Sequence, residues 1–180
     1  MKKILLILVV FFALFFGTNA LIHATSDDKF CTSCHEWMDT FVSTYHKDTH
    51  GGANKNGVKA SCVSCHLPHD SYIKYVFTKA KNGVSEVAVM LSSNAKDANW
   101  QENRKNRENF VYDSGCLSCH QTILDVNQTN KNIDDMHALY VKFKDDKTQK
   151  LSCVSCHKNV GHNELGKVLY EIKNPPVGNW

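Results

Sequence analysis

The chain repeats the pattern Cys-x-x-Cys-His four times, and this repeat constrains the fold more than any other feature. The motifs begin at Cys31, Cys62, Cys116 and Cys153, and they contain all eight cysteines of the 180-residue chain. In such a motif the two thiols can form thioethers with a porphyrin, and the following histidine is held under the iron. Zinc sites, redox dithiols and disulfides also use paired cysteines, but none of them needs a histidine after every pair. The sequence therefore predicts four covalently bound haem c groups.

The haem-attachment residues follow directly from the four motifs. The predicted thioether residues are Cys31, Cys34, Cys62, Cys65, Cys116, Cys119, Cys153 and Cys156. The predicted proximal iron ligands are His35, His66, His120 and His157.

The length of the chain suits one small domain whose core is supplied by the cofactors. Apart from its N-terminal segment, the chain is rich in Gly, Asn and Lys, so a core of side chains alone would be thin. We therefore expect a mostly α fold with extensive loops, in which an N-terminal transmembrane helix precedes a small multihaem cytochrome c domain wrapped around four haems. Without its haems the chain should be largely unfolded.

The N-terminal segment predicts a membrane anchor at residues 1–23, followed by a tetrahaem domain at 24–180. Residues 4–22 carry no charge, and 19 residues span about 28 Å as a helix, which is enough for the hydrocarbon core. Lys2 and Lys3 precede the segment, so we expect a single pass through the inner membrane with a cytoplasmic N-terminus and a periplasmic haem domain. The alternative is a signal peptide cleaved after Ala20, although the apolar run continues through Leu21 and Ile22.

The spacing of the motifs predicts two dihaem halves, at about 24–92 and 93–180. Residues 58–66 and 149–157 resemble each other around the second and fourth motifs, which favours a duplication. The net charge is only +3, and eight haem propionates would make the external domain acidic. We therefore expect no nucleic-acid partner.

Two amphipathic segments are predicted to pack near the haems or the membrane. Apolar residues from Ile133 to Phe143 follow helical spacing, on a helix that Asn132 could cap. Residues 71–81 mix lysines with aromatic and aliphatic residues, and Gly83 is expected to end this helix before the apolar run 84–91. Such a segment suits either the lipid headgroups or a helix packed on a haem.

Six histidines outside the motifs are candidates for the distal iron ligands. We assign this role to His50, His137 and His162; His162 follows its motif too closely to reach the same haem, so it should bind another one. His46 partly competes with His50, His69 could contact a propionate or a bound molecule, and His23 lies at the membrane edge. Three distal ligands for four irons leave the first haem open or weakly held, with Met38 nearby.

These motifs resemble the NapC/NirT family of tetrahaem membrane quinol dehydrogenases, in particular its short, nitrite-reductase-associated NrfH branch. The resemblance rests on the single N-terminal span, Cys-Thr-Ser-Cys-His-Glu followed closely by Met38, Thr49-His50, Met136-His137, and Cys156-His157-Lys158 with His162. It implies that the protein oxidises menaquinol at the membrane and passes electrons to a periplasmic multihaem reductase, with an ammonia-forming nitrite reductase as the expected partner. A homo-oligomer or larger complex is compatible with this role.

The resemblance also implies a role for particular residues. A methionine shortly after the first motif can bind the first iron in this family, so Met38 and His35 are alternative axial ligands. A lysine and an acidic residue at the quinol pocket correspond here to Lys79 and Glu86, the predicted catalytic pair. Two departures are that Met38 stands three rather than two residues after His35, and that Glu86 stands where the family has Asp.

Two other functions remain open at this point. A cleaved signal would make the protein a soluble periplasmic electron shuttle. An open haem with His69 or His46 beside it could instead reduce a small substrate such as nitrite or hydroxylamine. The sequence names neither the partner nor the direction of electron flow.

Overall fold

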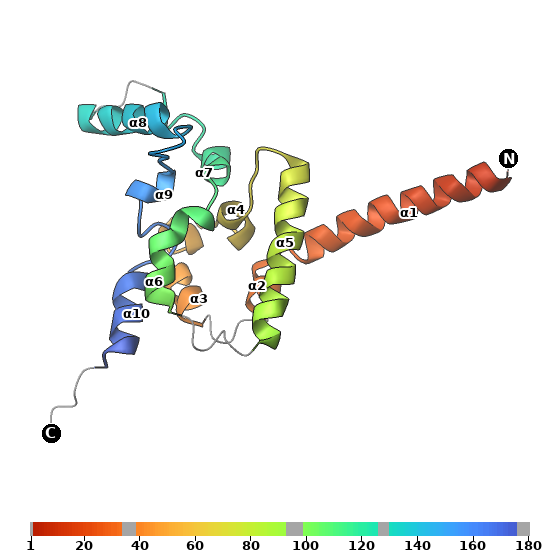
Figure 1. Cartoon of the computed structure of the whole chain (residues 1–180), viewed down its shortest axis with the longest axis horizontal. Coiled ribbons are helices and arrows are strands. Elements are labelled where there is room, and N and C mark those ends of the chain that lie inside the picture. Colours follow the sequence, from red (N-terminus) through yellow and green to blue (C-terminus); the bar gives the residue numbers. More distant parts are fainter. Residues whose placement is uncertain (1, 34–38, 93–98, 126–129, 176–180) are drawn as a thin grey trace.

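The structure, a computed structural model, describes residues 2–33, 39–92, 99–125 and 130–175 (Figure 1). Its elements are α1 (Lys2–Ala24), α2 (Asp28–Ser33), α3 (Asp39–His46), the 3-10 helix η2 (Thr49–Gly51), α4 (Cys62–His66), α5 (Tyr72–Leu91), α6 (Trp100–Asn103), the 3-10 helix η3 (Arg104–Asn109), α7 (Asp113–Cys119), α8 (Lys131–Phe143), α9 (Cys153–Cys156) and α10 (Leu165–Lys173). These ranges contain helices and loops and no strand, so the predicted mostly α fold is confirmed.

Helix α1 projects away from the rest of the molecule (Figure 1). It is uncharged after Lys3, and by length and composition it can cross a membrane. None of its residues is buried, because no other described element packs along it. This is the arrangement of an apolar helix whose surroundings are lipid rather than protein.

The attachment motifs lie on short helices that contact one another in chain order. Cys31 lies on α2, and the next three motifs begin on α4, α7 and α9. Helices α2 and α4, α4 and α7, and α7 and α9 are neighbours. A Cβ atom added to Gly115 of α7 would lie 2.0 Å from the carbonyl oxygen of Ser64 in α4, so only glycine allows this approach. The four sites therefore form one continuous series.

The protein contributes little apolar core of its own. The buried apolar side chains of the described residues are Tyr45, Leu67, Tyr140, Val154, Leu165 and Leu169. A domain of this size needs far more buried apolar surface to be stable. The deficit agrees with the expectation that haem faces supply most of the core.

Two helix boundaries differ from the sequence-based expectation. Helix α5 continues through Gly83, because a single glycine costs a helix only about 1 kcal/mol and the apolar spacing resumes on the same face. Helix α8 begins at Lys131, and its cap is Asn130, whose side chain accepts from the backbone N–H of Asn132. Asn132, the predicted cap, instead donates its backbone N–H to the actual cap, Asn130.

Candidate haem-binding site

The structure brings the three predicted distal histidines next to motif histidines. The ring centroids lie 6.4 Å apart for His66 and His162 and 6.1 Å apart for His50 and His120. For His137 and His157 the separation is also 6.4 Å. Imidazole nitrogen binds a first-row metal ion at about 2 Å, so two rings on opposite sides of one ion have centres about 6 Å apart. The residues present therefore fit three haem irons, each between two imidazoles.

Two of these pairs join the halves of the chain. His162 comes from the second half and faces the second motif, whereas His50 comes from the first half and faces the third motif. His162 is placed by the contact of α10 with α3, where the backbone N–H of Asn163 donates to the carbonyl oxygen of Thr44 at 3.0 Å. Of the three pairs, only the one at the fourth motif, His137 with His157, lies within one half.

Hydrogen bonds fix the orientation of three of these imidazoles. Nδ1 of His66 lies 2.8 Å from the carbonyl oxygen of Phe110, and Nδ1 of His162 lies 3.0 Å from that of Phe41. A carbonyl oxygen can only accept, so Nδ1 donates in both rings and Nε2 keeps its lone pair. Nδ1 of His50 donates in the same way to Asp48 Oδ1 at 3.0 Å. In its neutral form a ring held in this way presents Nε2 to a metal ion, the usual arrangement of a metal-binding histidine.

The surroundings also favour the neutral form of the second pair. Burial lowers the pKa of His66, and burial followed by the charge of His66 lowers the pKa of His162. Both rings are thus neutral near pH 7, which is the form that binds iron.

His137 shows a different signature. Its Nδ1 is buried and has no hydrogen-bond partner among the described residues. The ring borders a small cavity of about 200 Å³ on α8, together with Leu124, Asp125 and Val141. Buried polar atoms are almost always paired, so an unpaired imidazole nitrogen beside His157 indicates a missing partner. A haem between α8 and α9 would supply it if a propionate accepted from Nδ1, which would leave Nε2 for the iron.

The first site lies partly outside the described residues. Cys31 is placed on α2, whereas Cys34, His35 and Met38 lie in 34–38 and are not described. The alternatives His35 and Met38 for the first iron are therefore still a prediction. The remaining thioether cysteines, Cys62, Cys65, Cys116, Cys119, Cys153 and Cys156, are all placed on or at the ends of the motif helices.

Each half contains the same aspartate clamp, which sequence reasoning missed. In the first half Asp28 Oδ1 accepts from the backbone N–H of Cys62 at 2.8 Å, and Tyr45 donates to the other carboxylate oxygen at 3.4 Å. The clamp holds the first motif helix against the second.

The second half repeats this arrangement. Asp113 Oδ1 accepts from the backbone N–H of Cys153 at 2.9 Å, and Tyr140 donates to Asp113 Oδ2 at 2.9 Å. The signal that could have revealed the clamp is an aspartate three residues before the first cysteine of motifs one and three.

The two predicted quinol-site residues lie on one face of α5, nearly two turns apart. Nζ of Lys79 donates to the carbonyl oxygen of Thr25 at 2.7 Å and to Ser26 Oγ at 3.1 Å, so Lys79 joins α5 to the end of α1. Burial lowers the pKa of Lys79, and the Cys31 thiol is close enough to feel its charge. Glu86 is exposed and lies about 10 Å further along the helix axis.

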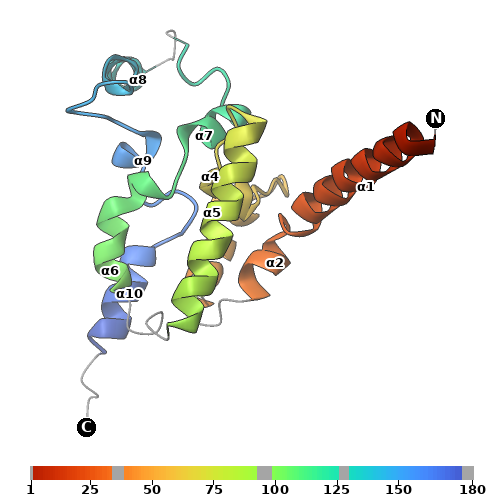
Figure 2. The ribbon, with the colours of Figure 1, turned by 45° about the vertical axis from the view of Figure 1, so that its right-hand side comes forward.

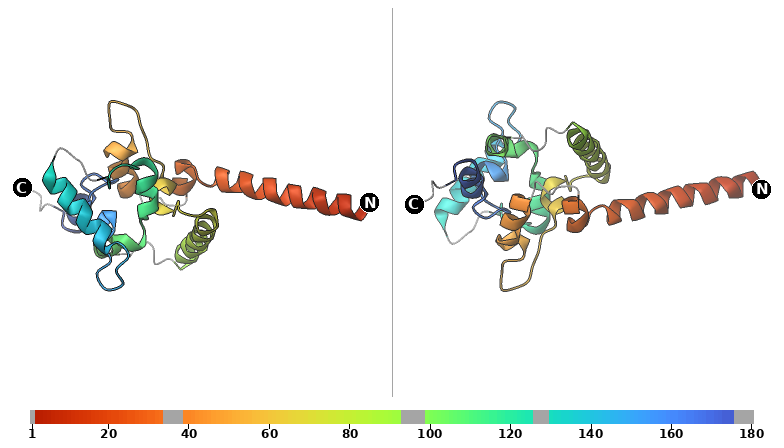
Figure 3. Two further views of the ribbon diagram at one scale, coloured as in Figure 1. Left: turned by 90° about the horizontal axis from the view of Figure 1, so that it is seen from above. Right: turned by 90° about the horizontal axis from the view of Figure 1, so that it is seen from below.

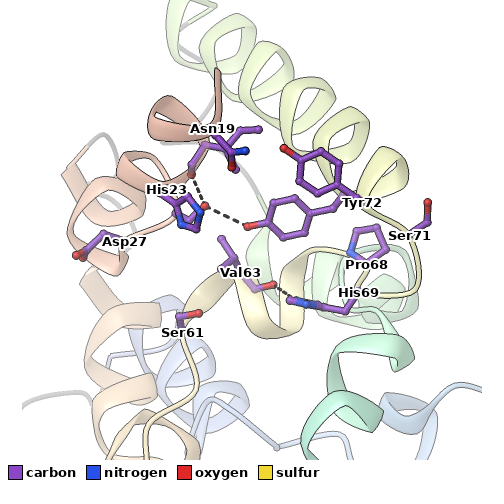
Figure 4. A pocket seen from close by; sticks show the side chains of 12 residues that line it. Asn19, His23, Asp27, Ser61, Val63, Pro68, His69, Ser71 and Tyr72 are labelled. Carbon is purple, nitrogen blue, oxygen red and sulfur yellow. Dashed lines mark hydrogen bonds between the residues drawn. The ribbon is translucent and has the colours of Figure 1, made fainter. Parts of the chain in front are cut away.

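A cleft of about 650 Å³ opens beside this junction, between the end of α1, α4 and the start of α5 (Figure 4). Its polar residues include His23, Asp27, Tyr75 and His69, and Tyr75 shares a 3.1 Å hydrogen bond with Ser26. Nε2 of His69 lies 3.0 Å from the carbonyl oxygen of Val63.

Three residues that the sequence suggested for a substrate pocket do not line this cleft. Neither Lys79 nor Glu86 lines it, although Ser26 connects it to Lys79. His46 is exposed at the end of α3, away from the cleft.

Four attachment motifs in series, with imidazole pairs between them, are the features of a multihaem c-type cytochrome. Comparison with known proteins agrees: the profile of the NapC/NirT cytochrome c family, N-terminal region, matches residues 1–167. The chain belongs to this family, and it therefore binds haem c covalently. Its four motifs agree in number with the tetraheme relative described next.

Three relatives illustrate the similarity. The chain is 30% identical to the tetraheme c-type cytochrome CymA of Shewanella oneidensis over 156 residues, which is 82% of this chain and 82% of CymA. It is 29% identical to the cytochrome c-type protein NrfH of Wolinella succinogenes, over 83% of this chain and 76% of NrfH. With NapC of Paracoccus pantotrophus it shares 28% identity, over 81% of this chain and 62% of NapC, so the match spans less than two thirds of that relative. No solved structure matches the chain.

Proposed function

We propose that this protein is a membrane-anchored tetrahaem cytochrome that oxidises menaquinol and passes the electrons to a periplasmic multihaem reductase of the ammonia-forming nitrite reductase type. One observation carries the proposal: the first haem-attachment helix starts four residues after the membrane helix ends, and Lys79 joins that point to α5. A haem on Cys31 then lies at the membrane surface. A quinol dissolved in the bilayer can reach such a site without leaving the lipid.

The series of attachment sites supports a path away from the membrane. The contacts between motif helices run from α2 to α4, α7 and α9 in order. The fourth site, with α8 and α9, lies on the side of the domain opposite α1 (Figure 1). A periplasmic partner would therefore dock near the fourth haem, where the protein is furthest from the lipid.

The quinol chemistry assigns separate tasks to Lys79 and Glu86. Oxidation of menaquinol to menaquinone releases two electrons and two protons, and each bound haem supplies a one-electron acceptor. The ammonium group of Lys79 donates a hydrogen bond to a quinol oxygen, and its partly buried position makes it a stronger donor. The carboxylate of Glu86 accepts a proton from the quinol hydroxyl and releases it to periplasmic water, which its exposure allows.

Replacement of Glu86 tests this assignment. Glu86→Gln should lower quinol-dependent haem reduction in liposomes by roughly 10²-fold, the usual effect of a positioned general base. Dithionite reduction should be unchanged, because dithionite needs no proton acceptor. Lys79→Ala should have a smaller effect. Glu171→Gln, an exposed change on α10, is the matched control and should behave as wild type. Normal quinol oxidation by Glu86→Gln would exclude Glu86 as the base.

A further inference from the structure

Helix α5 carries an apolar stripe that nothing in the described part of the chain covers. Ile73, Phe77, Val84 and Leu91 recur at intervals of four and seven residues, so they lie along one side of the helix. Their side chains are 71–79% exposed. All of α5 is described, and none of its residues is buried. A stripe about 27 Å long is too large to be left in water without a function.

The opposite side of α5 is the side that the protein uses. Lys79 and Tyr75 contact Thr25 and Ser26 at the end of α1. They stand more than a third of a helical turn away from the apolar stripe. The stripe therefore faces away from the contact that fixes α5 to the membrane helix.

The direction of α5 indicates what covers the stripe. In every view α5 lies crosswise to α1, at the side of the haem domain from which α1 projects (Figures 1, 2 and 3). If α1 crosses the bilayer, α5 then runs along its surface at the level where α1 emerges. Within α5 the charged residues are Lys74, Lys79, Lys81 and Glu86, an excess of positive charge that suits anionic headgroups.

We propose that α5 is a second membrane contact, an interfacial helix whose stripe of Ile73, Phe77, Val84 and Leu91 is inserted among the lipid acyl chains. Lys74 and Lys81 lie along one edge of the stripe, at the headgroups. This contact fixes the tilt of the haem domain on the bilayer, which a single anchor through the short segment after Ala24 leaves free. The proposal rests on α1 as a membrane span but not on quinol oxidation.

The test measures how fast an introduced thiol reacts with a water-soluble maleimide. The thioethers leave the wild-type holoprotein without reactive thiols, so it serves as the blank. Val84→Cys places a thiol on the stripe, and Ser85→Cys places one on the adjacent exposed residue, about 100° around the helix. Both holoproteins are reconstituted in liposomes that contain anionic phospholipid, and carbonate extraction first verifies that each is membrane-embedded.

In liposomes Val84→Cys should react at least about tenfold more slowly than Ser85→Cys, because lipid excludes the reagent and suppresses the thiolate. A maleimide carried on an acyl chain, which is concentrated in the bilayer, should reverse the order and react faster with Val84→Cys than with Ser85→Cys. Equal rates with the water-soluble reagent in liposomes would overturn the proposal. Slow reaction of Val84→Cys with both reagents would also overturn it, since the stripe would then be covered by the protein or by a second copy of the chain.

Discussion

Three of the six proposed axial histidines that the structure describes have their second ring nitrogen in a hydrogen bond. His66, His162 and His50 each donate through Nδ1, to Phe110, Phe41 and Asp48 respectively. Such a bond fixes the tautomer, orients the ring and makes Nε2 a better ligand. The haem sites are thus prepared by backbone carbonyls and one carboxylate.

His50 and its neighbour His46 provide a matched pair of substitutions. His50→Ala should convert one low-spin haem, the third, to a high-spin form, because it removes the ring opposite His120. His46→Ala should leave the spectrum unchanged, since His46 is exposed on the last turn of α3. Electron paramagnetic resonance measures the change, and intact mass should show four haems in both variants. A spectral change in His46→Ala alone would reverse the assignment.

The carboxylate of Asp28 connects the first aspartate clamp to pH. Burial alone would raise its pKa, but hydrogen bonds from Lys59 and from the backbone N–H of Cys62 outweigh burial and lower it. A carboxyl whose folded pKa is lowered adds stability above its ordinary pKa, near 4, and this stability is lost as the pH falls through the folded value. The ammonium group of Lys59 lies 2.7 Å from the Asp28 carboxylate, and it causes part of the lowering of the Asp28 pKa.

Lys59→Met should therefore lower the stability of the holoprotein modestly near pH 7, where the contribution of Asp28 is fully present, and should move acid unfolding to a higher pH. The exposed Lys55→Met is the control and should not move the transition. Circular dichroism during acid titration gives the midpoint. A midpoint equal to that of wild type would show that Lys59 does not support the clamp.

The motif helices are held together by close backbone contacts. Helix α4 meets α7 where Gly115 lies against Ser64, and the backbone N–H of Tyr112 donates to the carbonyl oxygen of Cys65 at 3.0 Å. This is also the boundary between the two proposed halves. Because His50 and His162 cross the same boundary, the halves depend on each other and should not fold separately.

Two glycine-to-alanine substitutions distinguish a collision at the α4–α7 contact from the general preference of helices for alanine. Gly115→Ala should lower the stability of the holoprotein by about 1–3 kcal/mol, because the new methyl group collides with the Ser64 carbonyl. Gly83→Ala should raise stability by about 0.5–1 kcal/mol, since no atom lies within 4 Å of its added Cβ and alanine favours the helix. Thermal unfolding measures both. A neutral Gly115→Ala would mean that α4 and α7 can separate without cost.

The sequence predicted the helical class and the attachment motifs because short-range patterns specify both. The proposed partners of the distal histidines could not be read from spacing: the ring of His50 lies across from that of His120, 70 positions later, and this depends on the packing of α4 on α7. The continuation of α5 through Gly83 was missed because one glycine is a weak helix breaker. The aspartate clamps were missed because Asp28 and Asp113 each act on a backbone N–H far along the chain.

At the scale of the whole molecule, the chain connects a lipid-facing end to a water-facing end. Helices α1 and α5 lie at one side, and α8 and α9 lie at the other (Figure 1). The attachment sites run between them in chain order. A protein of this shape suits the transfer of electrons from a membrane carrier to a soluble acceptor. The thin apolar core agrees with the expectation that the chain is largely unfolded without its haems.

The measurement that tests the account most directly is reduction of the wild-type holoprotein in liposomes by a menaquinol analogue, followed by haem absorbance without any partner enzyme. The account predicts that the quinol reduces haem rapidly, and that a quinol-site inhibitor blocks this reduction without affecting dithionite. Full reduction by dithionite together with no reduction by the quinol would contradict the account, because the protein would then be an electron carrier that does not accept electrons from the membrane pool.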